Sequence, residues 1–188
     1  MSRFIFFILA SLFFTDFMRS QTYYSQTYEF GDDIYPQNEL LKSIVDQDTL
    51  YALSIRRCPS GNCTEVSKIN INNGEILAER LFDWFNPGYP SKDVMIRDGE
   101  KIVISGKHGF FEEARYDLLV LNTGLDSIAH FEYAVEGDIE YVGNKSVISF
   151  GEYYIILGFT NTISDPLPSN MLWINKGDYS LDTIGFVA

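Results

Sequence analysis

Acidic, imidazole and aromatic side chains lie close together in one segment of this sequence and give it its clearest capacity for chemistry. His108 is followed at short spacing by Glu112 and Glu113. An imidazole that titrates near neutral pH can act as a base when a carboxylate orients it. Paired carboxylates can instead hydrolyse a glycosidic bond. A single histidine among loop acids is more commonly an ordinary surface group, so we expect no catalytic residue and keep a carbohydrate-active hydrolase as the alternative function.

Aromatic side chains before and after this histidine indicate a second kind of chemistry, which is binding. The candidate ligand-binding residues are His108 and five aromatic residues, namely Trp84, Phe85, Tyr89, Phe110 and Phe111. Exposed aromatic rings beside polar groups stack on sugars or anchor a protein partner. For Trp84 and Phe85 the competing interpretation is that they fill the space between packed elements, and we favour it for that pair.

The two cysteines, Cys58 and Cys63, are separated only by turn-forming residues. We predict a local disulfide, which the chain-entropy model values at roughly 2 kcal/mol for a loop of about six residues. A two-cysteine metal site would need further ligands, and no cysteine or histidine pair stands nearby in the sequence. The sequence also contains no cofactor fingerprint, so we expect neither a metal site nor a cofactor.

Length and composition indicate one globular domain. The chain has 188 residues, of which 46% are hydrophobic and 15% aromatic, enough to form a core. Lysine and arginine number 14 against 26 aspartate and glutamate residues, which gives a net charge of −12. This charge repels phosphate backbones and anionic lipid, so nucleic acid is not an expected partner.

Residues 1–20 have the order of a signal peptide. Arg3 precedes an apolar run from Phe4 to Phe14, which is shorter than the roughly 20 apolar residues of a membrane-spanning helix. We predict cleavage near Ser20 or Gln21, a secreted or cell-surface protein, and no membrane span after cleavage. An uncleaved N-terminal anchor is the alternative. Export to an oxidising compartment agrees with the predicted disulfide.

A repeat of about 51 residues organises residues 21–188. Asn-x-Gly turns recur at Asn72, Asn122 and Asn175, with separations of 50 and 53 residues, and polar turns that begin at Asp48, Gly99 and Gly151 are spaced by 51 and 52. β-Branched and aromatic runs between such turns predict four short strands in each repeat. In the second repeat the expected strands are residues 94–97, 101–106, 117–122 and 126–133. The middle two are nearly continuous apolar runs, so we expect protein to cover both of their faces.

Units of this length, each too small to bury its own faces, are typical of β-propellers. We therefore predict an all-β, propeller-like fold of about three four-stranded antiparallel blades, at residues 42–85, 94–136 and 146–188, with an additional outer strand at residues 27–30. A β-sandwich is the alternative. The residues after Asn38 also fit one short helix, but the repeat favours a strand from Lys42 to Val45.

The succession of outer strand, polar turn, apolar strand and Asn-x-Gly turn, as in the segment Gly151-Glu-Tyr-Tyr-Ile-Ile-Leu157, resembles the repeats of exported propeller proteins of Bacteroidota. Many of those proteins are cargo of the type IX secretion system. The resemblance covers about Tyr28 to Ala188. It implies export and no shared catalytic residues. The C-terminal sorting domain that such proteins usually carry is not recognisable in this sequence.

Three blades fall short of the four to eight that close a propeller ring. The outer strand at residues 27–30 also lacks a blade of its own. We expect the chain to be part of a longer protein, or else a module that closes by self-association, and we favour the first.

The connections between the second and third strands of each repeat, and between repeats, are long and differ from one another. Variable loops on a rigid scaffold are where binding residues tend to lie. The sequence therefore predicts an exported, non-catalytic module that binds a protein or a glycan through these loops. A purely structural surface repeat is the remaining alternative.

Overall fold

Twelve β-strands account for the regular structure of the residues that the computed structural model describes, which are 39–59, 61–87, 93–108, 114–134, 139–162 and 166–187. The strands are β1 (Glu39–Asp46), β2 (Thr49–Cys58), β3 (Gly61–Asn70), β4 (Ile76–Phe82), β5 (Met95–Asp98), β6 (Lys101–His108), β7 (Arg115–Asn122), β8 (Ser127–Ala134), β9 (Ile139–Phe150), β10 (Tyr153–Thr162), β11 (Pro166–Asn175) and β12 (Leu181–Val187). Within these ranges there is no helix, and hence none that is long and apolar enough to cross a membrane.

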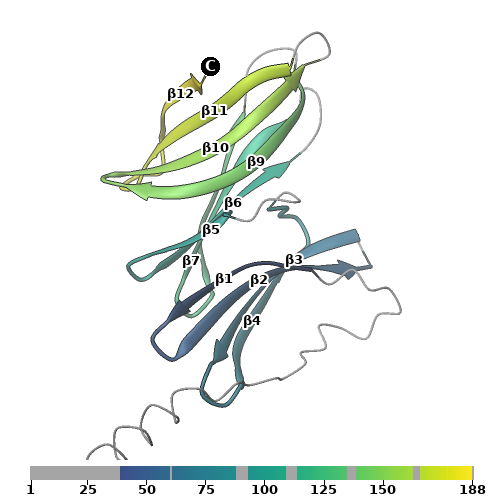
Figure 1. Cartoon of the computed structure of the whole chain (residues 1–188), viewed down its shortest axis with the longest axis vertical. Coiled ribbons are helices and arrows are strands. Elements are labelled where there is room, and N and C mark those ends of the chain that lie inside the picture. The colour runs from purple at the N-terminus through teal and green to yellow at the C-terminus, as the bar shows by residue number, and fades with distance from the viewer. Residues whose placement is uncertain are drawn as a thin grey trace, which may run out of the picture.

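The strands form three four-stranded antiparallel sheets, β1–β4, β5–β8 and β9–β12, in each of which neighbours in sequence pair in space (Figure 1). The predicted all-β architecture of four-stranded units is confirmed, and β1 contains the strand expected from Lys42 to Val45. The predicted signal peptide and the outer strand at residues 27–30 lie outside the described residues.

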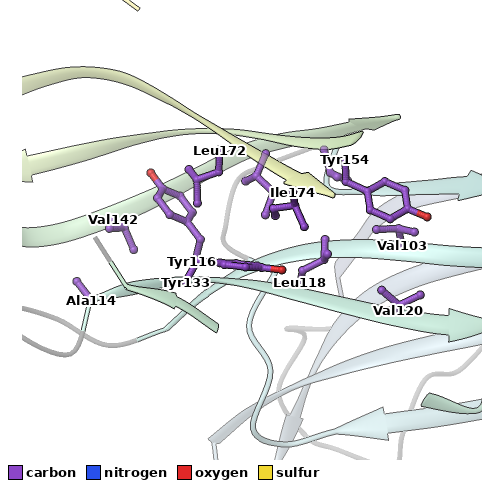
Figure 2. Close-up of a cluster of buried hydrophobic side chains, with 12 residues drawn as sticks. Val103, Ala114, Tyr116, Leu118, Val120, Tyr133, Val142, Tyr154, Leu172 and Ile174 are labelled. Atoms are coloured by element: carbon purple, nitrogen blue, oxygen red, sulfur yellow. The ribbon is translucent and has the colours of Figure 1, made fainter. Parts of the chain in front are cut away.

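The middle sheet packs against a neighbouring sheet on each of its faces. Side chains alternate between the faces of a strand, so Ile102 and Ile104 of β6 face the β1–β4 sheet, while Val103 faces the β9–β12 sheet. The second interface buries Tyr116 and Tyr154 together with valine and leucine side chains (Figure 2). Because both faces are covered, β6 and β7 are apolar almost throughout, as the sequence predicted. Three sheets stacked in this way differ from the two facing sheets of a sandwich.

The sheets repeat one another with a period of 52 or 53 residues, slightly longer than predicted. The third strand of each sheet ends at Asn70, Asn122 or Asn175, whose side-chain oxygen accepts a hydrogen bond of 2.7–2.9 Å from the backbone N–H two residues later. The predicted turn that contains Asn72 is present, but the residue equivalent to Asn122 and Asn175 is Asn70, two residues earlier. An additional asparagine pair follows Asn70 and reproduces the Asn-x-Gly pattern two residues late.

The turns between the first and second strands correct the other sequence anchor. Gln47, Gly99 and Gly151 occupy equivalent positions 52 residues apart, with φ angles of 52°, 59° and 54°. The assignment of Asp48 to this position is wrong by one residue, because the left-handed backbone falls on Gln47. Glycine adopts this conformation freely, whereas an L-residue with a side chain pays roughly 1–2 kcal/mol. Gln47 is therefore the strained member of the set.

We expect Gln47→Gly to raise the free energy of unfolding by about 0.5–1 kcal/mol, because relief of the left-handed strain exceeds the entropy that glycine adds to the unfolded chain. Gly151→Ala, the reciprocal change at the equivalent turn, should lower it by about 1 kcal/mol. Urea unfolding of both variants checks the pair. A loss of stability in Gln47→Gly would contradict the assigned turn.

The face of the β9–β12 sheet that points away from the middle sheet is also apolar. Phe150 and Ile148 are 63% and 42% exposed. The ring of Trp173 lies edge-on to Phe150, at a centroid distance of 6.2 Å, and to Tyr153, at 5.5 Å. A further blade or a second copy of the chain is what the sequence predicts to cover this face, and that stays a prediction.

Candidate ligand-binding site between the first two sheets

The connection that follows β4 is held in place by hydrogen bonds that its backbone carbonyls accept from other strands. The Thr64 hydroxyl donates a 2.6 Å hydrogen bond to the carbonyl of Phe85. The backbone N–H of Lys107 donates to the carbonyl of Asn86 at 2.8 Å. The side-chain amide of Asn144, in β9, donates to the carbonyl of Pro87 at 3.2 Å. Residues from all three sheets therefore fix this connection, which includes Trp84.

Phe85 and Trp84 have different roles. Phe85 is 2% exposed and fills the space between the first two sheets, as expected. Its ring covers Gly106, where a Cβ atom would lie 2.7 Å from Cζ of Phe85, so the position requires glycine. Trp84 is 45% exposed and does not belong to this core. The space-filling interpretation therefore holds for Phe85 alone.

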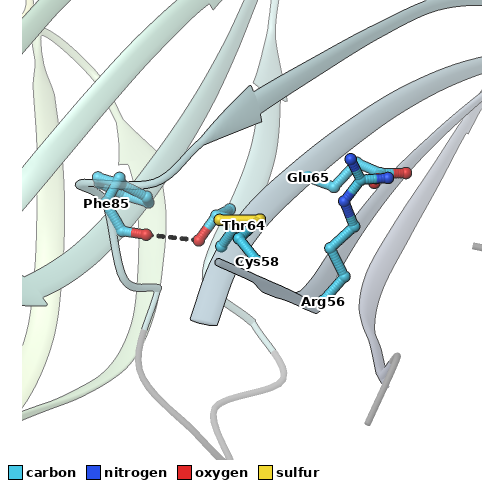
Figure 3. Close-up of a disulfide and its surroundings, with 6 residues drawn as sticks. Arg56, Cys58, Thr64, Glu65 and Phe85 are labelled. Carbon is cyan, nitrogen blue, oxygen red and sulfur yellow. Dashed lines mark hydrogen bonds and ion pairs between the residues drawn. A yellow bond between two sulfur atoms is a disulfide. The ribbon is translucent and has the colours of Figure 1, made fainter. Parts of the chain in front are cut away.

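The predicted disulfide between Cys58 and Cys63 is present and joins the end of β2 to β3. Figure 3 shows Thr64 and Phe85 on one side of the bridge and the pair Arg56–Glu65 on the other. The bridge thus reinforces the same hairpin that holds Phe85 through Thr64. Its place indicates that it supports the connection carrying Trp84.

Beneath Trp84 lies a polar cluster on the middle sheet. Asp117 of β7 is paired in register with Glu132 of β8, and His130 precedes Glu132 by two residues on the same strand. His130 Nε2 is 3.7 Å from Asp117 Oδ1, and Arg115 Nη1 is 2.6 Å from Glu132 Oε2. One possible ligand atom from each of Asp117, His130 and Glu132 lies within 4.8 Å of the other two.

The indole of Trp84 covers the imidazole of His130. Their ring centroids are 4.4 Å apart and the planes are tilted by 52°. Phe85 approaches the same imidazole edge-on at 6.3 Å. Because the backbone around Trp84 is fixed, its ring is held over the cluster before any ligand arrives, which lowers the entropy that binding would cost.

Burial dominates the electrostatics of the cluster. It raises the pKa of Asp117 to about 7, assisted by the Glu132 carboxylate across the strand pair and opposed by Arg115. Burial also lowers the pKa of His130 from its ordinary value of 6.5; Glu132 acts in the opposite direction, while His108 and Arg115 lower it further. Both groups are therefore biased toward their neutral forms.

A buried polar residue occurs at the equivalent position of every sheet. Glu65, Asp117 and Asn170 each stand opposite a small residue of the preceding strand and are at most 2% exposed. Glu65 is ion-paired with Arg56 at 2.9 Å, and Asn170 donates to the Tyr116 hydroxyl at 3.3 Å. The Oδ1 atom of Asp117 accepts no hydrogen bond from the residues that the structure describes. Oδ1 of Asn170 is likewise without one, so what distinguishes the middle sheet is the second carboxylate, Glu132, directly opposite its buried acid.

The structure brings together only some of the residues predicted from sequence. His108 ends β6, is exposed, and pairs in register with Arg115, at the same end of the middle sheet as the cluster. Tyr89, Phe110, Phe111, Glu112 and Glu113 lie outside the described residues. Sequence reasoning missed Asp117, His130 and Glu132 as a group. The available signal was Asp117 itself, an acid within a strand expected to be buried on both faces.

Comparisons with known proteins identify no family. No family model matches the chain, and no curated protein matches it. Among solved structures, the chain is similar to the acylaminoacyl peptidase of Pyrococcus horikoshii, with 10% sequence identity and a TM-score of 0.31. The match covers 78% of this chain and 32% of that one, so the chain spans about a third of the peptidase's length. A likeness this weak carries no argument about function.

Fluorescence tests the contact between Trp84 and His130. A protonated imidazole quenches an indole that it touches, so Trp84 emission should fall as the pH is lowered. The midpoint should lie below 6.5, because burial lowers the pKa of His130. The chain has two tryptophans, so the experiment uses the Trp173→Phe protein in buffer with a chelator. His130→Gln should remove the transition, and its persistence in that variant would contradict the contact.

Proposed function

We propose that this protein is an exported, non-catalytic module of propeller-like repeats that binds a glycan through the loop face above the first two sheets. The observation that carries the proposal is Trp84, which is 45% exposed and is held over His130 by a connection fixed to all three sheets. Function commonly resides in such connections between rigid elements.

The groups around Trp84 favour a sugar as the ligand, with a protein ligand as the other outcome of the test. The apolar face of a sugar ring stacks on an indole. Its hydroxyls need planar donors and acceptors beside that ring, which Arg115 and Glu132 supply, with side chains 32% and 43% exposed. The two are already paired at 2.6 Å, so their geometry is set before binding.

The arrangement of the carboxylates supports binding more than hydrolysis. A glycosidase places two carboxyl groups on either side of the bond that it cleaves. Asp117 is 1% exposed and faces Glu132 directly across a strand pair, so a substrate bond does not fit between them. The disulfide supports the exported location, since such bonds persist mainly in oxidising compartments.

Retention on a glycan array with peptide spots tests the proposal. The native protein should bind a subset of glycans, and Trp84→Ala should lose at least tenfold in affinity while keeping its unfolding midpoint. Trp173→Phe, a change at the other tryptophan, is the matched control and should bind as the native protein does. Retention on peptides alone would favour a protein ligand. Equal retention of native protein and Trp84→Ala would overturn the assignment of this face.

A further inference from the structure

Two buried polar atoms face each other in the cluster without hydrogen-bond partners. The Asp117 side chain is 2% exposed, and among the described residues neither its Oδ1 nor Nε2 of His130, 3.7 Å away, makes a hydrogen bond. A buried polar atom left in this way costs about 1–3 kcal/mol. Two of them directed at one point indicate a group that belongs between them.

We propose that Asp117, His130 and Glu132 bind a divalent transition-metal ion of the Zn²⁺ type. The ion would lie between β7 and β8, with one ligand atom from each side chain. This inference shares Glu132 with the glycan proposal but rests on the buried pair Asp117 and His130 and does not use the Trp84 ring.

The distances suit such an ion. Zinc binds histidine nitrogen and carboxylate oxygen at about 2.0–2.2 Å, so two ligand atoms on one ion lie roughly 3.4–3.8 Å apart for angles of about 110–130°. The Asp117–His130 separation of 3.7 Å falls in this range. The third ligand atom, from Glu132, lies within 4.8 Å of both and comes from a side chain that is 43% exposed. A small rotation of that side chain completes three ligands and leaves the solvent side open.

The donor set also decides the class of ion. One imidazole and two carboxylates suit zinc and its first-row neighbours, whereas calcium takes six to eight oxygen ligands. Arg115 does not block the site, because it engages one oxygen of Glu132 and leaves the other. Ligating carboxylates are commonly hydrogen-bonded in this manner by an outer residue.

The equivalent buried acid of the first sheet, Glu65, has a cationic partner that Asp117 lacks between β7 and β8. The buried carboxylate of Glu65 is stabilised by the Arg56 cation at 2.9 Å and by the Ser67 hydroxyl at 3.1 Å. Asp117 faces a second carboxylate, that of Glu132, across the strand pair instead. A divalent cation would supply for Asp117 the positive charge that Arg56 supplies for Glu65.

Calorimetric titration of the chelator-treated protein with zinc chloride tests the proposal. One ion should bind per chain, and Asp117→Asn, His130→Gln and Glu132→Gln should each weaken the affinity at least tenfold. Glu79→Gln removes an exposed carboxylate from β4 and should leave the affinity unchanged. Unchanged affinity in Asp117→Asn, or no saturable binding to the native protein, would overturn the site.

A second measurement on the native protein keeps the test independent of how the variants fold. The chain has two histidines, His108 and His130, so long-range ¹H–¹⁵N spectra resolve both imidazoles. Zinc should shift the Nε2 signal of His130 at one equivalent. A shift confined to His108 would show surface binding only and would contradict the proposal. Loss of zinc binding is read from Asp117→Asn and loss of glycan retention from Trp84→Ala, so either proposal can fail alone.

Discussion

Asp117→Asn is expected to make the metal-free protein more stable at pH 8, by about 3 kcal/mol. The native carboxyl has a pKa of about 7 because burial and Glu132 oppose its ionisation, against an ordinary value of 3.8. Each pKa unit corresponds to about 1.4 kcal/mol, so ionisation of this group costs the folded state roughly 4 kcal/mol, part of which a buried amide retains. Urea unfolding with a chelator present measures the difference.

The pH dependence gives this prediction its sign. Between pH 4 and 7 the folded protein holds a proton on Asp117 that the unfolded chain has released, so native stability falls as the pH rises through this window. The gain from Asp117→Asn should therefore be small at pH 5 and complete above pH 7. Asp126→Asn is the control, since the exposed Asp126 has its pKa lowered by hydrogen bonds from Arg80 and Asn122. That change should not stabilise the protein. Destabilisation by Asp117→Asn at pH 8 would contradict the assigned environment.

Phe85→Ala should have the opposite effect and lower the free energy of unfolding by about 3–5 kcal/mol. The ring is 2% exposed, lies between the first two sheets and fits against Gly106. Its removal leaves a cavity that the paired strands around it cannot close. Chemical denaturation at pH 7 measures the loss.

The matched control for this change is Phe150→Ala, on the outward face of the β9–β12 sheet. Phe150 is 63% exposed, so its removal should cost well under 1 kcal/mol. Similar losses for the two variants would show that Phe85 is not a core residue. The Phe85 variant should also lose the pH-dependent quenching of Trp84, because the connection between the sheets no longer holds the indole in place.

The strands were predictable because the hydrophobic composition of each segment reflects how deeply that segment is buried. β6 and β7 are covered on both faces and are apolar on both, so Lys101 to Asn122 indicated two central strands. The register of the repeat was less predictable. Asn70 and Asn72 both fit an Asn-x-x turn, and only the strand pairing shows which of them ends β3. Gln47 gave no signal for a left-handed turn, because glycine normally marks that position.

The candidate site was predictable as a region and not as a set of residues. Trp84 was identifiable as an aromatic residue in a long connection, and its neighbour Phe85 has the same sequence signature with the opposite role. Asp117 and His130 lie 13 residues apart in the sequence and meet only through the pairing of β7 with β8. Contacts of this kind depend on register, which a single sequence does not encode locally.

The central claim is that the ligand contacts the Trp84 ring directly and that the position of this ring is already set in the unbound protein. Titration of the Trp173→Phe protein with the glycan retained on the array tests it most directly, because Trp84 is then the only tryptophan. We predict a saturable change in Trp84 emission whose midpoint matches the affinity measured by retention. A glycan that is retained without any change in this emission would show that it binds elsewhere on the chain and would contradict the claim.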